Sequence, residues 1–409
     1  MREDQMLQVA ITGRGVISSL GNTIGEFNAG LDRGKSTAVH APWADEAGGN
    51  LFYAPVREFD PSNWLDERTA RGTDRFAQYA VAAATNALAD AGIDEPDPLR
   101  TAVVMGTSMA GAQTLYDADA AYREGGFAAV PRKVQLMAWP NMAAGQTALR
   151  WRLHGPLLTV STACASSLDA IGIAARMIEA GLADTAIVGG TDNGQAKISG
   201  MAAAQYGMSP TDVADPTKIC MPFDVHRRGV IPGDGAGVIV LENLAHAEKR
   251  GARVHGIVRG YASLSDGYHP SSPDPSGKWE VETIRAAQID AEIAPSEIGA
   301  VVAHGTGTPV GDISEIIAIN ELFPPEVAVT SLKGTLGHTA GAAGVMGVIA
   351  GLHTMDSGTL APTANTTELE PEVSFRVPLG SPSAVTGDAF QVNAFGFGGQ
   401  NASLVVTRA

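Results

Sequence analysis

One cysteine and two histidines stand in short segments of unusual composition, far apart in the sequence. Cys164 lies in V-S-T-A-C-A-S-S, His304 in A-H-G-T-G-T-P and His338 in K-G-T-L-G-H-T-A-G-A-A-G. A cysteine that opens a helix can be an activated nucleophile, and imidazoles held in Gly-rich turns can donate hydrogen bonds to a reacting oxygen. Together these residue types indicate chemistry on a thioester.

The segment around the cysteine predicts a junction between a strand and a helix. Residues 157–160 read as a short buried strand, and apolar residues at helical spacing run from Leu168 until Gly181. Cys164 would then lie at a helix N-terminus, where unpaired N–H groups and the macrodipole favour the thiolate. A lone cysteine is more often a small buried hydrophobe, and this is the prediction for Cys220, which precedes Met-Pro in an irregular stretch.

Both histidines follow apolar runs that are short enough to be buried strands. Residues 299–303 precede His304, and residues 329–332 precede His338, after which residues 341–352 read as a buried helix. In open α/β sheets, ligands bind beside the carboxyl ends of strands. Either histidine alone could equally be structural, but the two together with the cysteine predict an active site.

The three segments, in this order, resemble the Cys-His-His signature of the decarboxylating beta-ketoacyl-acyl carrier protein synthases, the condensing enzymes of fatty acid and polyketide synthesis. Other segments resemble the same family: R-G-T-D-R-F-A-Q-Y-A from Arg71, P-F-D-V-H-R-R-G from Pro222 and N-A-F-G-F-G-G-Q-N from Asn393. The resemblance implies an α/β, thiolase-like fold of five αβαβα layers with two duplicated halves. We expect residues 1–253 to carry the nucleophile and residues 254–409 to carry both histidines.

A weak internal sequence similarity agrees with a duplication. The segments D-A-G-I and A-V-V within residues 90–104 are matched by D-A-E-I and A-V-V within residues 290–302, and residues 9–13 resemble residues 256–260. No low-complexity linker separates the two halves, so we expect them to pack as one body.

The resemblance also implies a reaction. Cys164 would attack an acyl thioester carried on the phosphopantetheine arm of an acyl carrier protein. A malonyl unit on a second carrier would lose CO2, and its enolate would attack the enzyme-bound acyl group. Such a reaction needs hydrogen-bond donors at the thioester oxygen, and His304 and His338 can supply two. By resemblance, the backbone N–H groups of Cys164 and Phe397 form the oxyanion hole.

The remaining site residues are likewise implied by the family. Thr306 and Thr308 match its pantetheine contacts, Phe397 matches a gating residue, and Met109 matches a position that limits acyl length. Lys333 and Glu315 match a charged pair buried behind the histidines, which should orient His338. A buried charge without a partner is costly, so pairing is expected, with a surface ion pair as the alternative.

Two departures from the family pattern bear on the substrate. The common D-G-F-V is Arg228-Gly229-Val230-Ile231 here, and loss of the aromatic side chain predicts a wider pocket. The segment S-T-A-C-A-S-S also differs from the A-T-A-C-T-S-G of housekeeping fatty acid enzymes. We therefore expect a 3-oxoacyl-[acyl-carrier-protein] synthase of a type II polyketide pathway, with a fatty acid elongation synthase as the alternative. A chain-length subunit without catalysis is the alternative of another class, but it would typically lack the nucleophile.

Composition is that of a globular enzyme. Of 409 residues, 44% are hydrophobic, and two cysteines allow no disulfide framework. The first residues do not read as a signal peptide, and no apolar run of about 18 residues predicts a membrane span. We expect a cytoplasmic protein with no metal and no bound cofactor.

Charge sets a constraint on partners. The formal net charge of −16 argues against nucleic acid binding, and an acidic carrier protein would be repelled at long range. Docking would depend on local cations, and four match the family's docking positions: Arg68, Arg71, Arg132 and Lys133. The family forms dimers, so we expect a homodimer or a heterodimer with a related, Cys-less chain-length subunit.

Overall fold

Ten strands, hydrogen-bonded side by side, form the frame of the protein. The structure, a computed structural model, describes residues 7–194 and 196–409. The strands of the first part are β1 (Val9–Ser18), β4 (Thr101–Gly106), β5 (Leu157–Val160), β6 (Thr185–Asp192) and β7 (Gly235–Asn243). Those of the second part are β8 (Gly256–Ser265), β9 (Ile298–Val302), β10 (Ala328–Thr330), β13 (Ala389–Gly396) and β14 (Gln400–Thr407).

The two parts have the same strand order. The first part has the order β5-β4-β6-β7-β1, and the second part has the order β10-β9-β13-β14-β8. When the five strands of a part are counted along the chain, the third lies at one edge of that part and the first lies at the other. They meet where β1 pairs antiparallel with β8, Val9–Ile11 against Gly256–Val258. The similar segments found in the sequence are thus the first strands of the two parts, and A-V-V occurs in the second strand of each.

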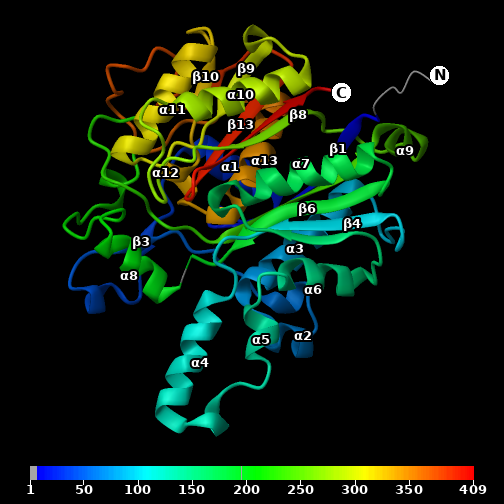
Figure 1. Ribbon diagram of the computed structural model, residues 1–409, viewed down its shortest axis with the longest axis vertical. Helices are drawn as coiled ribbons and strands as arrows, with labels where there is room; N and C mark the ends of the chain where they lie inside the picture. Colours follow the sequence, from blue (N-terminus) through cyan, green and yellow to red (C-terminus); the bar gives the residue numbers. More distant parts are fainter. Residues whose placement is uncertain (1–6, 195) are drawn as a thin grey trace.

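Helices cover both parts and fill the space between them (Figure 1). Helices α3 (Arg75–Ala91) and α6 (Met142–Trp151) pack on the outer face of the first part. Helices α7 (Ser166–Glu179) and α13 (Ala343–Ser357) lie in the middle layer, and α10 (Lys278–Ala291) with α11 (Pro309–Leu322) covers the second part. The five-layer αβαβα fold is confirmed.

Further helices and two small ribbons complete the fold. The other helices are α1 (Ile24–Arg33), α2 (Glu67–Arg71), α4 (Ala112–Gly125), α5 (Val134–Ala138), α8 (Lys197–Gln205), α9 (Leu244–Lys249) and α12 (Lys333–Leu336). Two small ribbons pair β2 (Val39–His40) with β3 (Phe52–Tyr53) and β11 (Thr359–Leu360) with β12 (Ser383–Ala384). Among the helices of the described ranges, none is both long and apolar enough for a membrane crossing.

The middle layer explains the Gly/Ala-rich segment of the sequence. Helix α13 is buried on nearly all sides, which requires an apolar surface all round. It approaches its neighbours so closely that a Cβ atom on Gly344 would lie 2.5 Å from Cγ of Leu168, and one on Gly351 would lie 2.1 Å from the ring of Phe390. Small residues thus allow the two parts of the sheet to pack against one central pair of helices.

The strand predicted at residues 157–160 is present as β5, but the prediction that it is buried is wrong. Strand β5 pairs with β4 at one side and is otherwise an edge, with Leu157 48% and Leu158 41% exposed. Helix α4 extends away from the body (Figure 1), and the segment that connects it to α5 exposes apolar side chains, among them Phe127, 89% exposed. An apolar edge strand is normally covered by another protein chain or segment. Its amino-acid composition is therefore the same as that of a strand buried within one chain.

Candidate active site

Cys164 lies in a one-turn 3-10 helix (Ala163–Ala165) that leads directly into α7. Ala163 has φ +49°, a left-handed conformation that is unusual for a non-glycine residue and that turns the chain sharply before the thiol. Burial raises the pKa of the Cys164 thiol, and the backbone N–H groups of Phe397 and Cys164, which lie near the sulfur, oppose this rise to a smaller extent. The end of β13 comes so close that a Cβ atom on Gly396 would lie 3.1 Å from the Cys164 nitrogen.

His338 is in direct contact with the nucleophile. Its Nε2 lies 3.0 Å from Sγ of Cys164. The backbone N–H of Ala340 donates to Nδ1 at 3.3 Å, so Nδ1 carries no proton and Nε2–H points at the sulfur. The prediction that His338 directly follows a strand is wrong, because the four-residue helix α12 lies between β10 and this histidine.

His304 follows β9 and faces the other ring. The centroids of the two imidazoles are 5.5 Å apart, and the ring planes make an angle of 81°. The sulfur of Cys164, one ring nitrogen of His304 and one ring nitrogen of His338 all lie within 4.8 Å of one another. Lys333 Nζ lies 3.4 Å from Nδ1 of His304 and donates to its carbonyl oxygen. Because Lys333 is a donor, Nδ1 of His304 accepts, which leaves Nε2–H for the cavity. Burial and the Lys333 charge hold the pKa of both imidazoles well below the usual value, so both are neutral donors at pH 7.

Lys333 and Glu315 are both buried, so the surface alternative is wrong. They are not joined by a direct ion pair, contrary to the prediction. Glu315 instead accepts hydrogen bonds from the backbone N–H groups of His304 at 2.8 Å and Gly305 at 2.7 Å, and burial raises its pKa to about 7. Both charged residues therefore position His304 and not, as predicted, His338.

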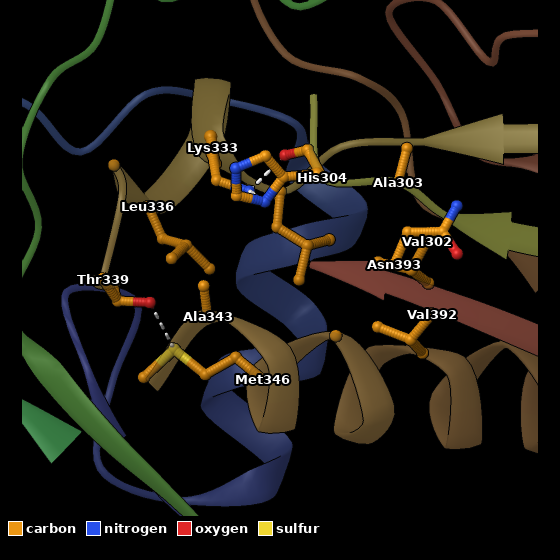
Figure 2. A pocket seen from close by; sticks show the side chains of 13 residues that line it. Val302, Ala303, His304, Lys333, Leu336, Thr339, Ala343, Met346, Val392 and Asn393 are labelled. Carbon is orange, nitrogen blue, oxygen red and sulfur yellow. Dashed lines mark hydrogen bonds between the residues drawn. The ribbon is translucent and has the colours of Figure 1, made fainter. Parts of the chain in front are cut away.

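A small cavity of about 20 Å³ lies beside His304, which forms part of its wall (Figure 2). Lys333 borders it on one side, and most of its wall is apolar: Val302, Leu336, Met346 and Val392. This volume is close to that of one water molecule. His304 thus separates a packed interior from the open substrate cavity, which limits how far its ring can retreat.

The expected stabilisation of the Cys164 thiolate is outweighed by burial. Burial is the main cause that raises the pKa of the thiol to about 11; the positive charge of Lys333 opposes this rise, and the nearby Asp192 carboxylate adds to it. The pKa of Cys220 rises for the same reason to about 12, and this side chain is fully buried. The resting nucleophile is therefore a thiol whose proton leaves during acyl transfer.

A pH titration of thiol reactivity tests this state. Alkylation of Cys164 by iodoacetamide should accelerate about tenfold for each pH unit from pH 7 to pH 9, because the thiolate fraction rises tenfold per unit below the pKa. Mass spectrometry of the Cys164 peptide measures the rate, and Cys220→Ala should leave it unchanged. A plateau below pH 8 would show instead that the helix terminus and the N–H groups outweigh burial.

The substrate positions predicted from the sequence meet in one open cavity of about 950 Å³, together with the nucleophile and both histidines. Oγ1 of Thr306 lies 2.8 Å from Oγ1 of Thr308 in its wall. Met109 is 39% exposed and Phe397 48% exposed. Val230 lines the same cavity, at the position where the common family pattern has an aromatic side chain.

Asp192 was missed in the sequence and organises the floor of the site. This buried carboxylate accepts backbone hydrogen bonds from Ser108 at 2.9 Å, Met109 at 2.8 Å and Gly341 at 2.6 Å. It thereby joins the loop after β4 to the start of the α13 segment. One signal in the sequence could have identified Asp192: it ends the segment T-A-I-V-G-G-T-D, and this segment is strand β6, whose carboxyl end is at Asp192.

The four predicted docking cations are all exposed. Arg68 and Arg71 lie on α2, while Arg132 and Lys133 directly precede α5. Nζ of Lys133 is 3.2 Å from the position of a Cβ atom on Gly72, so the two segments adjoin. Arg71 also pairs with Glu67 at 3.3 Å on the same short helix.

Family models match most of the chain. The beta-ketoacyl synthase N-terminal domain matches residues 6–247, and the corresponding C-terminal domain matches residues 255–367. The chain belongs to the beta-ketoacyl synthase family. The predictions of the family, of its fold and of an acyltransferase of the condensing type are confirmed.

Relatives cover the whole chain. The chain is 34% identical to a 3-oxoacyl-[acyl-carrier-protein] synthase 2 of Vibrio harveyi, over 97% of this chain and 98% of the relative. It is 33% identical to the Synechocystis protein of that name, over 97% of both chains.

Solved structures agree. An ishigamide ketosynthase/chain length factor is 31% identical with a TM-score of 0.92, covering 99% of this chain and 100% of the other. A type II polyketide ketosynthase, solved with its acyl carrier protein and bound to the hexaketide, is 25% identical with a TM-score of 0.91 and the same coverage.

Proposed function

We propose that the protein is a 3-oxoacyl-[acyl-carrier-protein] synthase that condenses an acyl group held on Cys164 with a malonyl group on an acyl carrier protein. The observation that carries the proposal is the contact between Sγ and Nε2 of His338, with His304 facing the same cavity. A thiol beside two neutral imidazole donors meets the needs of acyl transfer followed by enolate formation.

In the first step, Sγ of Cys164 attacks the thioester carbonyl carbon of the acyl carrier. The backbone N–H groups of Cys164 and Phe397, which lie near the sulfur, would stabilise the oxyanion. The carbon–sulfur bond to the carrier then breaks, and the carrier thiol leaves with a proton in exchange for the one lost by Cys164. No net proton is consumed.

In the second step, malonyl carrier loses CO2. The electron pair of the broken carbon–carbon bond moves toward the thioester carbonyl and forms an enolate, whose oxygen can accept from Nε2–H of His304 and His338. The enolate carbon attacks the acyl group on Cys164, the bond between that carbonyl carbon and the sulfur breaks, and the sulfur leaves as a thiolate that takes up one proton from solvent. This step consumes one proton, because CO2 leaves from a malonyl carboxylate. Lys333 and Glu315 act by holding His304, since neither borders the open cavity.

The pathway and the partner subunit belong to this proposal. Fatty acid synthases among the relatives and polyketide ketosynthases among the solved structures fit equally, and we propose a type II polyketide pathway because of the departures noted in the nucleophile segment. We further propose a dimer formed through β5 and the α4–α5 region, with an identical chain or a Cys-less chain-length subunit. Native mass spectrometry of the copurified complex distinguishes these two partners.

Other expectations stay predictions. We propose that the reaction uses no bound metal or cofactor, because the pantetheine thioester supplies the chemistry, although the Cys-His-His spacing is one that a thiophilic ion could bridge. We also propose a cytoplasmic location and a division of the chain near residue 253, which is supported by the common strand order of the two parts.

Docking of the acyl carrier is tested by charge reversal. Arg68→Glu, Arg71→Glu, Arg132→Glu and Lys133→Glu should each raise the apparent KM for acyl carrier about three- to tenfold and weaken its dependence on salt. The reason is that these exposed cations face an acidic partner on a protein of net charge −16. Steady-state kinetics from low to high ionic strength gives the measurement.

The matched control is Lys249→Glu, which changes charge equally on α9, at the far side of the molecule from α2 and α5 (Figure 1). Acylation by a carrier-free thioester should be nearly unchanged in every variant. Equal losses with both substrates would mean that the four residues support the fold, and no loss with either would place docking elsewhere.

A further inference from the structure

Asp169 is a buried carboxylate in the first turn of α7, shortly after the nucleophile, and the mechanism above does not use it. Each of its two oxygens accepts a hydrogen bond from a different segment. Oγ1 of Thr162 donates to Oδ2, and the phenol of Tyr261 donates to Oδ1 at 2.7 Å. The carboxylate thus connects the start of the nucleophile turn, residues 162–166, with strand β8 of the second part.

The nucleophile turn has a backbone conformation that needs support. Ala163 has φ +49°, which a non-glycine residue keeps only where the surrounding contacts impose it. Ser166 supports the turn from inside: its Oγ accepts from the N–H of Thr162 at 2.9 Å and donates to the carbonyl oxygen of Ala163 at 2.6 Å. Asp169 supports it from outside, through the side chain of Thr162.

The place of Thr162 bears directly on the reacting groups. A Cβ atom on Gly396 would lie 2.9 Å from the carbonyl oxygen of Thr162 and 3.1 Å from the nitrogen of Cys164, so the turn packs tightly against the end of β13. A shift of the turn would therefore change the distance between the two N–H groups of the proposed oxyanion hole. It would also disturb the contact of 3.0 Å between Sγ and Nε2 of His338. A misplacement of about 1 Å can cost about 100-fold in rate.

Tyr261 anchors Asp169 to the second part of the protein. Its ring lies directly on α7, because a Cβ atom on Gly172 would lie 2.3 Å from Cγ of Tyr261. Burial, and then the negative charge of Asp169, raise the pKa of Tyr261, so the phenol keeps its proton and donates it. The backbone N–H of Tyr261 donates to Oδ2 of Asp290 at 2.9 Å, and Arg176, further along α7, pairs with the same oxygen.

We propose that Asp169 is a positioning residue, and that the hydrogen bonds from Tyr261 and Thr162 to its carboxylate hold the nucleophile turn in register with the second part, which supplies both histidines. Because it concerns the same nucleophile, this inference rests on the proposed function. Asp169 is not among the described residues that line the cavity, so its loss should lower kcat for acylation and leave KM for the acyl carrier largely unchanged.

The kinetic test follows acylation of Cys164 by a butanoyl carrier protein, measured by intact mass. Asp169→Leu and Thr162→Val should each lower kcat about 10- to 100-fold, with KM within about twofold of the wild-type value. Asp169→Asn should restore most of the rate, because its carbonyl can accept from Tyr261 while its NH2 group donates to Oγ1 of Thr162.

The matched control is Arg176→Met, which breaks the ion pair of the same helix with Asp290 and should acylate like the wild-type protein. Equal losses in Arg176→Met and Asp169→Leu would assign Asp169 to the general stability of α7. A loss in Asp169→Asn as large as in Asp169→Leu would mean that the charge matters and the hydrogen bonds do not. Either result would overturn the inference.

Tyr261→Phe tests the link to the second part and carries the test if Asp169→Leu does not fold. It keeps the ring on Gly172, removes only the hydroxyl, and should lower kcat about three- to tenfold. In the Asp169→Leu background the same replacement should have no further effect, because the link is already broken. Wild-type acylation in Tyr261→Phe, or losses that multiply in the double variant, would contradict a link through Asp169.

Amide hydrogen exchange without substrate gives a readout of positioning that does not depend on the reaction. Exchange in the peptide that contains residues 162–166, measured by mass spectrometry, should accelerate about tenfold in Asp169→Leu and Thr162→Val and stay unchanged in Asp169→Asn and Arg176→Met. Unchanged exchange in Asp169→Leu would overturn the inference. Faster exchange in that variant, with no acylation of the wild-type protein by any thioester, would instead reject the proposed reaction and leave the positioning role in place.

Discussion

Replacing Cys164 with alanine is expected to abolish acylation of the protein and, with it, every condensation product. The thiol is the group that the geometry offers for attack, since it meets His338 at 3.0 Å and two backbone N–H groups converge on it. Loss of a nucleophile lowers turnover by on the order of 10⁴-fold or more. Intact mass after incubation with an acyl-carrier thioester should show one added acyl group in the wild-type protein and none in Cys164→Ala.

Cys220→Ala is the matched control and should acylate normally, because the Cys220 thiol is fully buried and its pKa is raised to about 12. Peptide mapping locates the acyl group. An acyl group on the Cys220 peptide, or undiminished acylation of Cys164→Ala, would show that the nucleophile has been misassigned.

Local signals in the sequence were sufficient to place the three reactive residues. An apolar run that ends in a Gly/Thr-rich turn marked the end of β9, the short run L-L-T-V before S-T-A-C marked β5, and the helical spacing after Cys164 predicted α7. The missed element, α12, has four residues, K-G-T-L, and is too short to show any periodicity. Its omission misplaced His338 relative to β10 but not relative to the sheet edge at which ligands bind.

Quantities that depend on burial could not be obtained from the sequence. The pKa of Cys164 is set by desolvation and by charges from other elements, Asp192 at the end of β6 and Lys333 on α12. The helix start, which is visible in sequence, is one contribution among several. Likewise the composition of β5 does not reveal whether the rest of the protein or a second subunit covers it, because both settings require the same apolar residues.

His304→Ala and His338→Ala should each reduce condensation about 10²- to 10³-fold, with acylation of Cys164 retained in part. Each imidazole is neutral and presents Nε2–H to the cavity, so each supplies one donor to the enolate oxygen. Release of CO2 from malonyl carrier, measured alongside acylation by mass, separates the two steps. His154→Ala, an exposed imidazole outside the cavity, is the control and should match the wild-type protein.

The two histidines should differ in a way that their contacts dictate. His338 touches the sulfur, so its replacement should slow acylation more than that of His304. His304 is held by Lys333, so Lys333→Met should reproduce the condensation defect of His304→Ala with little effect on acylation. Unimpaired CO2 release in both histidine variants would remove the enolate role. Equal acylation losses in the two variants would mean that the contact between His338 and Cys164 does not assist the nucleophile.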